Sequence, residues 1–169
     1  MGDKEPQDFA EVINAAEREG WVTTMGLRLV RATRDEVTGE MEIQPMHHQA
    51  YGIVHGGVYA GIVETLASVG AAIDAFKRGQ SVVGLENHTT FLRAVRSGKL
   101  YAVAKPLTRG RRTQVWEGMI FDEEGGLAVA KGSVRLLVLD AGSKSQASRW
   151  GSNRNASPSR YGVVAENDR

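Results

Sequence analysis

A single acid interrupts an apolar stretch that follows a His-Gly-Gly sequence. The run from His55 to Ser68 reads HGGVYAGIVETLAS, and its acid is Glu64. An ionised group is costly to bury without partners, so an acid on the apolar stripe of a helix is a candidate for chemistry. The spacing alone leaves open the alternative that Glu64 is an ordinary solvent-facing helix residue.

Gly56 and Gly57 stand where the helix is expected to start. The first N–H groups of a helix have no partner within it and lie at the positive end of its dipole. Glycine also lets a carbonyl group approach closely, so the pair is a candidate oxyanion site. Gly56 and Glu64 are eight residues apart, about 12 Å along a helix at ~1.5 Å per residue. We therefore expect a site shared between two subunits.

The other polar residues nearby have both functional and structural interpretations. Ser68 follows Glu64 by one helical turn on the same face, where it either contacts the carboxylate or only packs. His55 is interpreted as a hydrogen-bonding residue that fixes the loop rather than as a general base. His47, His48 and His55 lack a second cluster or an acid at ligand spacing, so no metal site is expected.

The elements that must position these residues follow from hydrophobic periodicity. An amphipathic helix is predicted over Pro6–Glu19, and a long helix from Gly56 to about Lys77 whose many small residues would let a second backbone approach closely. Pro106 inside a strand indicates an edge position or a bulge. Strands are predicted over Thr24–Thr33, Val37–Ile43, Ser81–Val95, Leu100–Thr108, Thr113–Asp122 and Leu127–Leu139.

Composition limits the class of protein. The 169 residues are 41% hydrophobic, contain no cysteine and carry a net charge of +1, so nothing calls for nucleic acid or an anionic membrane. The start of the chain lacks a signal peptide's apolar segment, and the apolar window at 53–76 carries His55, Glu64 and Asp74, which disfavours a membrane span. We expect a cytoplasmic protein with an N-terminal helix (1–20), one folded domain (21–140) and a flexible tail (141–169).

The string Gln49-x-x-Gly52-x-x-His55-Gly56-Gly57, followed by Glu64, resembles the helix-entry motif of hot-dog-fold acyl-CoA thioesterases. It is most similar to the 4-hydroxybenzoyl-CoA and phenylacetyl-CoA thioesterase group, in its glutamate-using branch. The resemblance covers about residues 21–139. It implies an α+β hot-dog fold, in which a six-stranded antiparallel sheet wraps around one long central helix.

The resemblance also implies roles for individual residues. The Gly56 N–H would polarise the thioester carbonyl, Gln49 would help to orient it, and Glu64 would be the nucleophile or general base. Ser68 stands where this branch often has a threonine. The residue types agree with these roles, because a thiolate departs readily and one carboxylate with a polarised carbonyl suffices without a Ser/His/Asp triad.

The CoA phosphates need basic residues at the mouth of the pocket. Two turns are rich in arginine, and the resemblance favours Arg93 and the pair Arg112-Thr113, although each also fits a solvated turn. Asn87 and His88 would line the acyl pocket or lie at a dimer edge. Tyr51, Tyr59 and Leu66 would line that pocket, which would suit an aromatic or a medium aliphatic chain.

The resulting hypothesis is an acyl-CoA thioesterase that needs no cofactor. It would form a homodimer, and two such dimers would assemble into a tetramer. Its catalytic residues are Glu64, Gly56, Gln49 and Ser68, and its substrate-binding residues are His55, Gly57, Asn87, Arg93, Arg112 and Thr113. The alternative is a non-catalytic module that binds acyl-CoA. A hot-dog enoyl-CoA hydratase is disfavoured, because the expected Asp/His pair does not follow Gly57.

Overall fold

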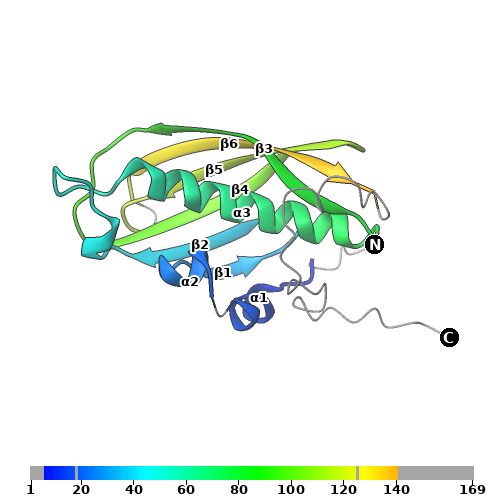
Figure 1. Cartoon of the computed structure of the whole chain (residues 1–169), viewed down its shortest axis with the longest axis horizontal. Helices are drawn as coiled ribbons and strands as arrows, with labels where there is room; N and C mark the ends of the chain where they lie inside the picture. The colour runs from blue at the N-terminus through cyan, green and yellow to red at the C-terminus, as the bar shows by residue number, and fades with distance from the viewer. Residues whose placement is uncertain (1–5, 18, 125, 141–169) are drawn as a thin grey trace, which may run out of the picture.

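A six-stranded antiparallel sheet curves around one long helix, α3 (Gly56–Phe76), in a computed structural model that describes residues 6–17, 19–124 and 126–140 (Figure 1). The strands lie in the spatial order β1, β2, β4, β5, β6, β3, and each neighbouring pair is antiparallel. The predicted hot-dog fold is confirmed. The strands are β1 (Arg28–Ala32), β2 (Val37–Glu42), β3 (Ser81–Phe91), β4 (Lys99–Arg109), β5 (Thr113–Phe121) and β6 (Ala128–Leu139).

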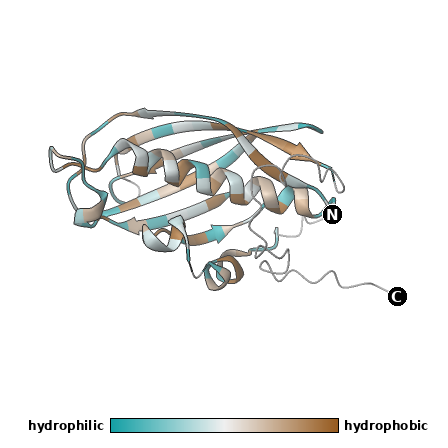
Figure 2. Ribbon diagram, viewed as in Figure 1, coloured by the Kyte–Doolittle hydropathy of each residue, from teal (hydrophilic) through white to brown (hydrophobic). Residues whose placement is uncertain are grey.

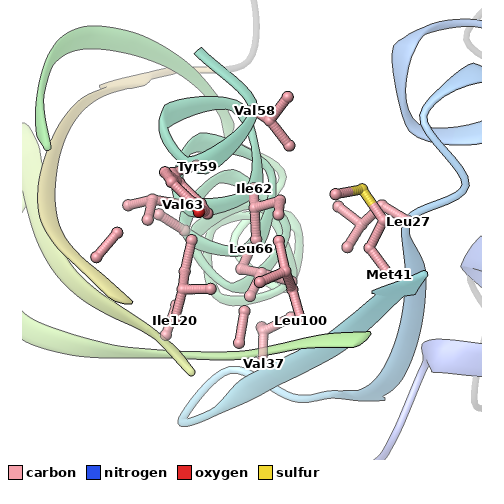
Figure 3. Packing of buried hydrophobic residues seen from close by; sticks show 14 of the residues in the cluster. Leu27, Val37, Met41, Val58, Tyr59, Ile62, Val63, Leu66, Leu100 and Ile120 are labelled. Carbon is pink, nitrogen blue, oxygen red and sulfur yellow. The ribbon is translucent and has the colours of Figure 1, made fainter. Parts of the chain in front are cut away.

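The core lies between α3 and the concave face of the sheet. Figure 3 shows Ile62 and Leu66 of α3 pointing toward the sheet, where Leu100 and Ile120 project upward, and all four are buried. Figure 2 shows α3 in pale and brown shades along most of its length, as a helix enclosed by a sheet requires. Among the described residues α3 alone is long and apolar enough to cross a membrane, a test that the core helix of a soluble protein also passes.

The small residues of α3 accommodate aromatic rings. A Cβ at Gly61 would collide with the Trp21 ring, and one at Gly70 would collide with the Trp116 ring. The expectation that the small residues admit a second backbone is therefore wrong at Gly61, and Gly70, which was not part of it, shows the same use of a glycine. Each glycine instead makes room for a tryptophan ring, because any larger residue at that position would collide with it.

The two edges of the sheet differ. Helix α1 (Ala10–Ala16) packs beside β1 at one edge. At the other edge β3 is exposed except at Val82 and Thr89, and its exposed residues include Val83 and Leu85. A long edge strand with apolar residues is a surface on which a second chain can pair.

Some predicted boundaries change. The first strand begins at Arg28 instead of Thr24, because residues Trp21–Thr24 form a short helix, α2. The third predicted strand ends at Phe91, four residues early, and the N-terminal helix is shorter than predicted. Pro106 lies at a register shift of β4 against β5 and beyond the last pair of β4 with β2, Ala104 with Val37, so both interpretations, a bulge and a locally unpaired edge, are confirmed. The predicted tail at 141–169 lies outside the described residues.

Candidate active site

A cavity of about 670 Å³ lies at the N-terminus of α3. It brings together five of the residues predicted for the site, from three separate segments: the loop before α3, the start of α3 and the segment after β3. Its walls are Gln49, Ile53, Val54, His55, Gly56, Gly57, Tyr59, Phe91, Leu92, Arg93 and Ala94. A lining that is mostly apolar, with two aromatic rings and a few polar groups, is typical of a small-molecule site.

The entrance of α3 leaves one N–H group free. His55 is the N-cap residue, and its Nδ1 accepts a hydrogen bond from the Gly57 N–H at 2.9 Å. Because Nδ1 is the acceptor, a neutral His55 carries its proton on Nε2. The Gly56 N–H has no acceptor among the described residues. The cap thus occupies Gly57 and leaves Gly56 available to a carbonyl oxygen in the cavity.

The loop that carries Gln49 is held by its own turn and by an arginine. The Gln49 N–H donates to the Ile53 carbonyl, and the Gly52 N–H donates back to the Gln49 carbonyl, both at 2.9 Å. Gly52 has φ +67°, a conformation that favours glycine. Arg96 donates to the carbonyl oxygens of Tyr51 and Gly52 at 3.1 Å each. Arg96, which was not among the predicted site residues, therefore holds this wall of the cavity.

Glu64 lies outside this cavity. It is half-buried on the face of α3 that packs against β3, where Asn87 Nδ2 donates to its Oε2 at 2.9 Å. Ser68 is half-buried one turn further on and makes no side-chain hydrogen bond with the described residues. Neither Asn87 nor His88 is a wall of the cavity in one chain, and both lie on the exposed edge strand β3, so of their two predicted places the dimer edge stays a prediction. One chain thus presents Gly56 and Glu64 in two separate places.

Arg112 and Thr113 lie at the far end of the sheet. Thr113 pairs with Leu137 of β6, whereas Phe91, a wall of the cavity, pairs with Ala130 of the same strand. Seven residues along a strand correspond to roughly 23 Å. Within one chain the structure therefore does not bring Arg112 or Thr113 to the cavity, and only Arg93 of the predicted basic residues lines it.

The predicted acyl pocket is correct only in part. Tyr59 lines the cavity, but Tyr51 is 81% exposed and Leu66 is buried in the core. Phe91 takes their place, with its ring 6.1 Å from that of Tyr59. The Tyr59 hydroxyl is buried and has no partner among the described residues, and burial raises the pKa of this phenol.

The histidines before α3 are structural. His47 is buried, its Nδ1 accepts from the Gln44 N–H at 2.9 Å, and its Nε2 lies 3.1 Å from the Met25 carbonyl oxygen. His48 Nε2 lies 2.8 Å from the Arg96 carbonyl oxygen. Within the described residues no three His, Cys, Asp or Glu side chains gather in a way that would hold a metal ion.

Comparisons with known proteins agree with this architecture. Residues 51–129 match the family model described as the thioesterase superfamily. The Mycobacterium tuberculosis protein named "Putative esterase Rv1847" is 40% identical over 119 residues, which are 69% of this chain and 84% of that protein. Its solved structure has a TM-score of 0.69, with 39% identity over 71% of this chain and 96% of that one. The thioesterase HI1161 of Haemophilus influenzae has a TM-score of 0.72, with 30% identity over 78% and 90% of the two chains.

Proposed function

The chain belongs to the thioesterase superfamily and is a thioester hydrolase, and we propose that its substrate is an aromatic or medium-chain acyl-CoA. The observation that carries this proposal is the cavity at the helix entrance, which Gly56, Tyr59 and Phe91 line together and where the Gly56 N–H has no acceptor among the described residues. Membership of this family sets aside the alternative of a module that only binds acyl-CoA. We also propose the glutamate-using branch of the 4-hydroxybenzoyl-CoA and phenylacetyl-CoA group.

In the proposed mechanism the Gly56 N–H donates to the thioester carbonyl oxygen and stabilises the negative charge that develops on it. Gln49, another wall of the cavity, orients the carbonyl. Glu64 either takes a proton from the attacking water or attacks the carbonyl carbon itself, and water then cleaves the anhydride. The C–S bond breaks, CoA leaves as a thiolate that takes up a proton, and the acyl group is released as the acid.

The separation of Gly56 and Glu64 supports a site made by two subunits. Glu64 is absent from the cavity wall, and it faces β3, the exposed edge strand. A second copy that pairs along β3 would bring its own helix entrance toward this edge. We therefore propose a homodimer, assembled further into a tetramer, in which Gly56 and Gln49 of one chain face Glu64 and Ser68 of the other.

The proposed dimer also gives roles to the other residues predicted for the site. Arg93 in the cavity wall is proposed to bind CoA phosphate, while Arg112 and Thr113 reach a cavity only if a partner chain supplies them. His55 and Gly57 shape the entrance as its cap. We propose a cytoplasmic enzyme that works without a cofactor, nucleic acid or membrane.

A panel assay tests this function. The full chain is incubated with aromatic and aliphatic acyl-CoAs of increasing length, and the free thiol of CoA is measured over time. We expect the highest kcat/KM for acyl groups that fill the cavity beside Tyr59 and Phe91. Equal rates for acetyl-CoA and for the aromatic and medium-chain esters would contradict the proposed substrate class.

A further inference from the structure

Asn87 of β3 binds one oxygen of the Glu64 carboxylate. Its Nδ2 donates to Glu64 Oε2 at 2.9 Å and to the Ala60 carbonyl oxygen at 3.0 Å. The Ala60 carbonyl only accepts hydrogen bonds, so the atom that faces it must be the amide nitrogen. Both hydrogens of the Asn87 amide are thus committed, one to the helix backbone and one to the carboxylate.

Thr89 holds the other end of the same amide. Its Oγ1 donates to Asn87 Oδ1 at 2.7 Å. Gly132 of β6 provides the room, because a Cβ there would lie 2.7 Å from Thr89 Oγ1. Asn87 therefore has a partner at each end of its amide and can rotate only by breaking hydrogen bonds.

A β-bulge brings Gly84 to the same carboxylate. Gly84 and Asn87 are three residues apart, so in a regular strand they would face opposite sides of the sheet. The register of β3 against β6 shifts between Gly84 and Glu86, and the extra residue turns both positions toward α3. A Cβ at Gly84 would lie 2.6 Å from Glu64 Oε1. The absence of a side chain at position 84 is what lets this oxygen lie there.

The two carboxylate oxygens are therefore not equivalent. Oε2 accepts the Asn87 hydrogen bond, while Oε1 has no donor among the described residues and lies over a glycine in the exposed edge strand. We propose that Asn87, Thr89 and Gly84 are positioning residues that hold Oε2 and leave Oε1 as the reacting oxygen of Glu64. This inference rests on the proposed catalytic role of Glu64.

The test is steady-state kinetics of Asn87→Ala on the best acyl-CoA of the panel. We expect kcat to fall about 10- to 100-fold, the effect of losing one hydrogen bond to a charged group. KM should stay within about threefold, because both hydrogens of the Asn87 amide are committed to Ala60 and Glu64 and none is left for the substrate. His88→Ala is the matched control, since His88 is the next residue on the opposite face of the strand, and it should keep the parent kcat.

A pair of substitutions at Thr89 keeps the test decisive if Asn87→Ala folds poorly. Thr89→Val keeps the shape of the side chain and removes the donor, whereas Thr89→Ser keeps the donor. We expect kcat to fall in the valine variant and to stay near the parent value in the serine variant, which a packing role alone would not produce. Gly84→Ala should also lower kcat, because its Cβ displaces Oε1.

The outcomes separate this inference from the proposed function. If Glu64→Gln loses activity while Asn87→Ala and Thr89→Val both keep kcat within about twofold of the parent, the positioning role is wrong and the catalytic role of Glu64 stands. If Glu64→Gln itself keeps activity, the catalytic assignment fails, and this inference fails with it.

Discussion

The Phe91 ring lies directly on Gly56: a Cβ at position 56 would be 2.6 Å from Phe91 Cζ. The end of the exposed edge strand thus packs on the first residue of α3, and the Phe91 ring also lies 6.1 Å from the Tyr59 ring in the cavity wall. One aromatic side chain therefore forms a wall of the cavity and demands a glycine at the helix entrance. The glycine expected to admit a substrate carbonyl is also required by packing.

Gly56→Ala is expected to lower kcat/KM about 100-fold or more, because the added methyl group displaces Phe91 and narrows the approach to the N–H. The double variant Gly56→Ala/Phe91→Ala should recover the melting temperature that the single variant loses, since the colliding ring is gone. Acyl-CoA kinetics and thermal unfolding check both effects. A single variant with parental activity and melting temperature would contradict this account of the entrance.

Glu64→Gln is expected to lower kcat about a thousandfold, since the amide neither accepts a proton nor attacks a carbonyl. It should fold as the parent does, because Gln keeps the length of the side chain and an oxygen that accepts from Asn87. Glu86→Gln is the matched control: this acid is exposed on β3 and pairs with Arg135 at 3.0 Å, so its loss should leave kcat unchanged. Hydrolysis by Glu64→Gln within a few-fold of the parent would refute the assignment.

The fold was predictable because each element has a clear period and a clear end. Alternation specified the strands, the 3.6-residue stripe specified α3, and Gly56–Phe76 differs from the predicted range by one residue. The helix entrance was predictable too, since Gln49, His55, Gly56 and Gly57 are close in the chain and meet in one cavity. Residues this close in the chain can be placed in one site from their spacing alone.

Contacts between distant segments were not predictable. The partnership of Asn87 with Glu64 depends on a bulge in β3, and no pattern marks where a strand shifts its register by one residue. Tyr51 and Leu66 were misplaced for a related reason: apolar character does not say whether a side chain lines a cavity, packs in the core or stays exposed. The four-residue spacing of Asp74 and Arg78 is, by contrast, a local pattern that indicates their ion pair on one face of α3.

Asp74 is more buried than Glu64, at 3% exposure. The energetic cost of burying an acid in α3 therefore applies to Asp74 as well as to Glu64. Its Oδ2 accepts from Arg78 at 2.8 Å and from Gln114 at 3.1 Å, and Gln114 in turn accepts from Trp116. The network lies at the end of α3 away from the cavity. It is a structural network, and its loss should act on stability rather than on the chemical step.

Asp74→Ala is therefore expected to lower the free energy of unfolding by about 2 kcal/mol, because the buried Gln114 amide loses its acceptor. This corresponds to a fall of roughly 4–8 °C in melting temperature for a chain of this size. The kcat of the folded fraction should not change. Arg78→Ala is the control, since Arg78 is largely exposed and its removal should cost less than about 1 kcal/mol. Equal losses in the two variants would contradict the role of burial.

His47 makes the stability depend on pH. Burial lowers the pKa of its imidazole below the ordinary value of 6.5, against a smaller opposing effect of the Met25 carbonyl, and the neighbouring His48 lowers it further. The unfolded chain therefore binds more protons below about pH 6.5. The free energy of unfolding should be constant with respect to this group above that pH, and should fall as the pH drops toward the folded-state pKa.

His47→Gln removes that dependence. Denaturant unfolding between about pH 7 and pH 5 should show a slope for the parent of up to about 1.4 kcal/mol per pH unit from this group, and a smaller slope for the variant. His88→Gln, which changes an exposed ring, should keep the parental slope. Because His47 joins the Gln44 N–H to the Met25 carbonyl, its protonation removes the Nδ1 acceptor on which the turn before the cavity depends. The loss of stability in acid should therefore begin in that turn, and identical slopes for the parent and His47→Gln would exclude this origin.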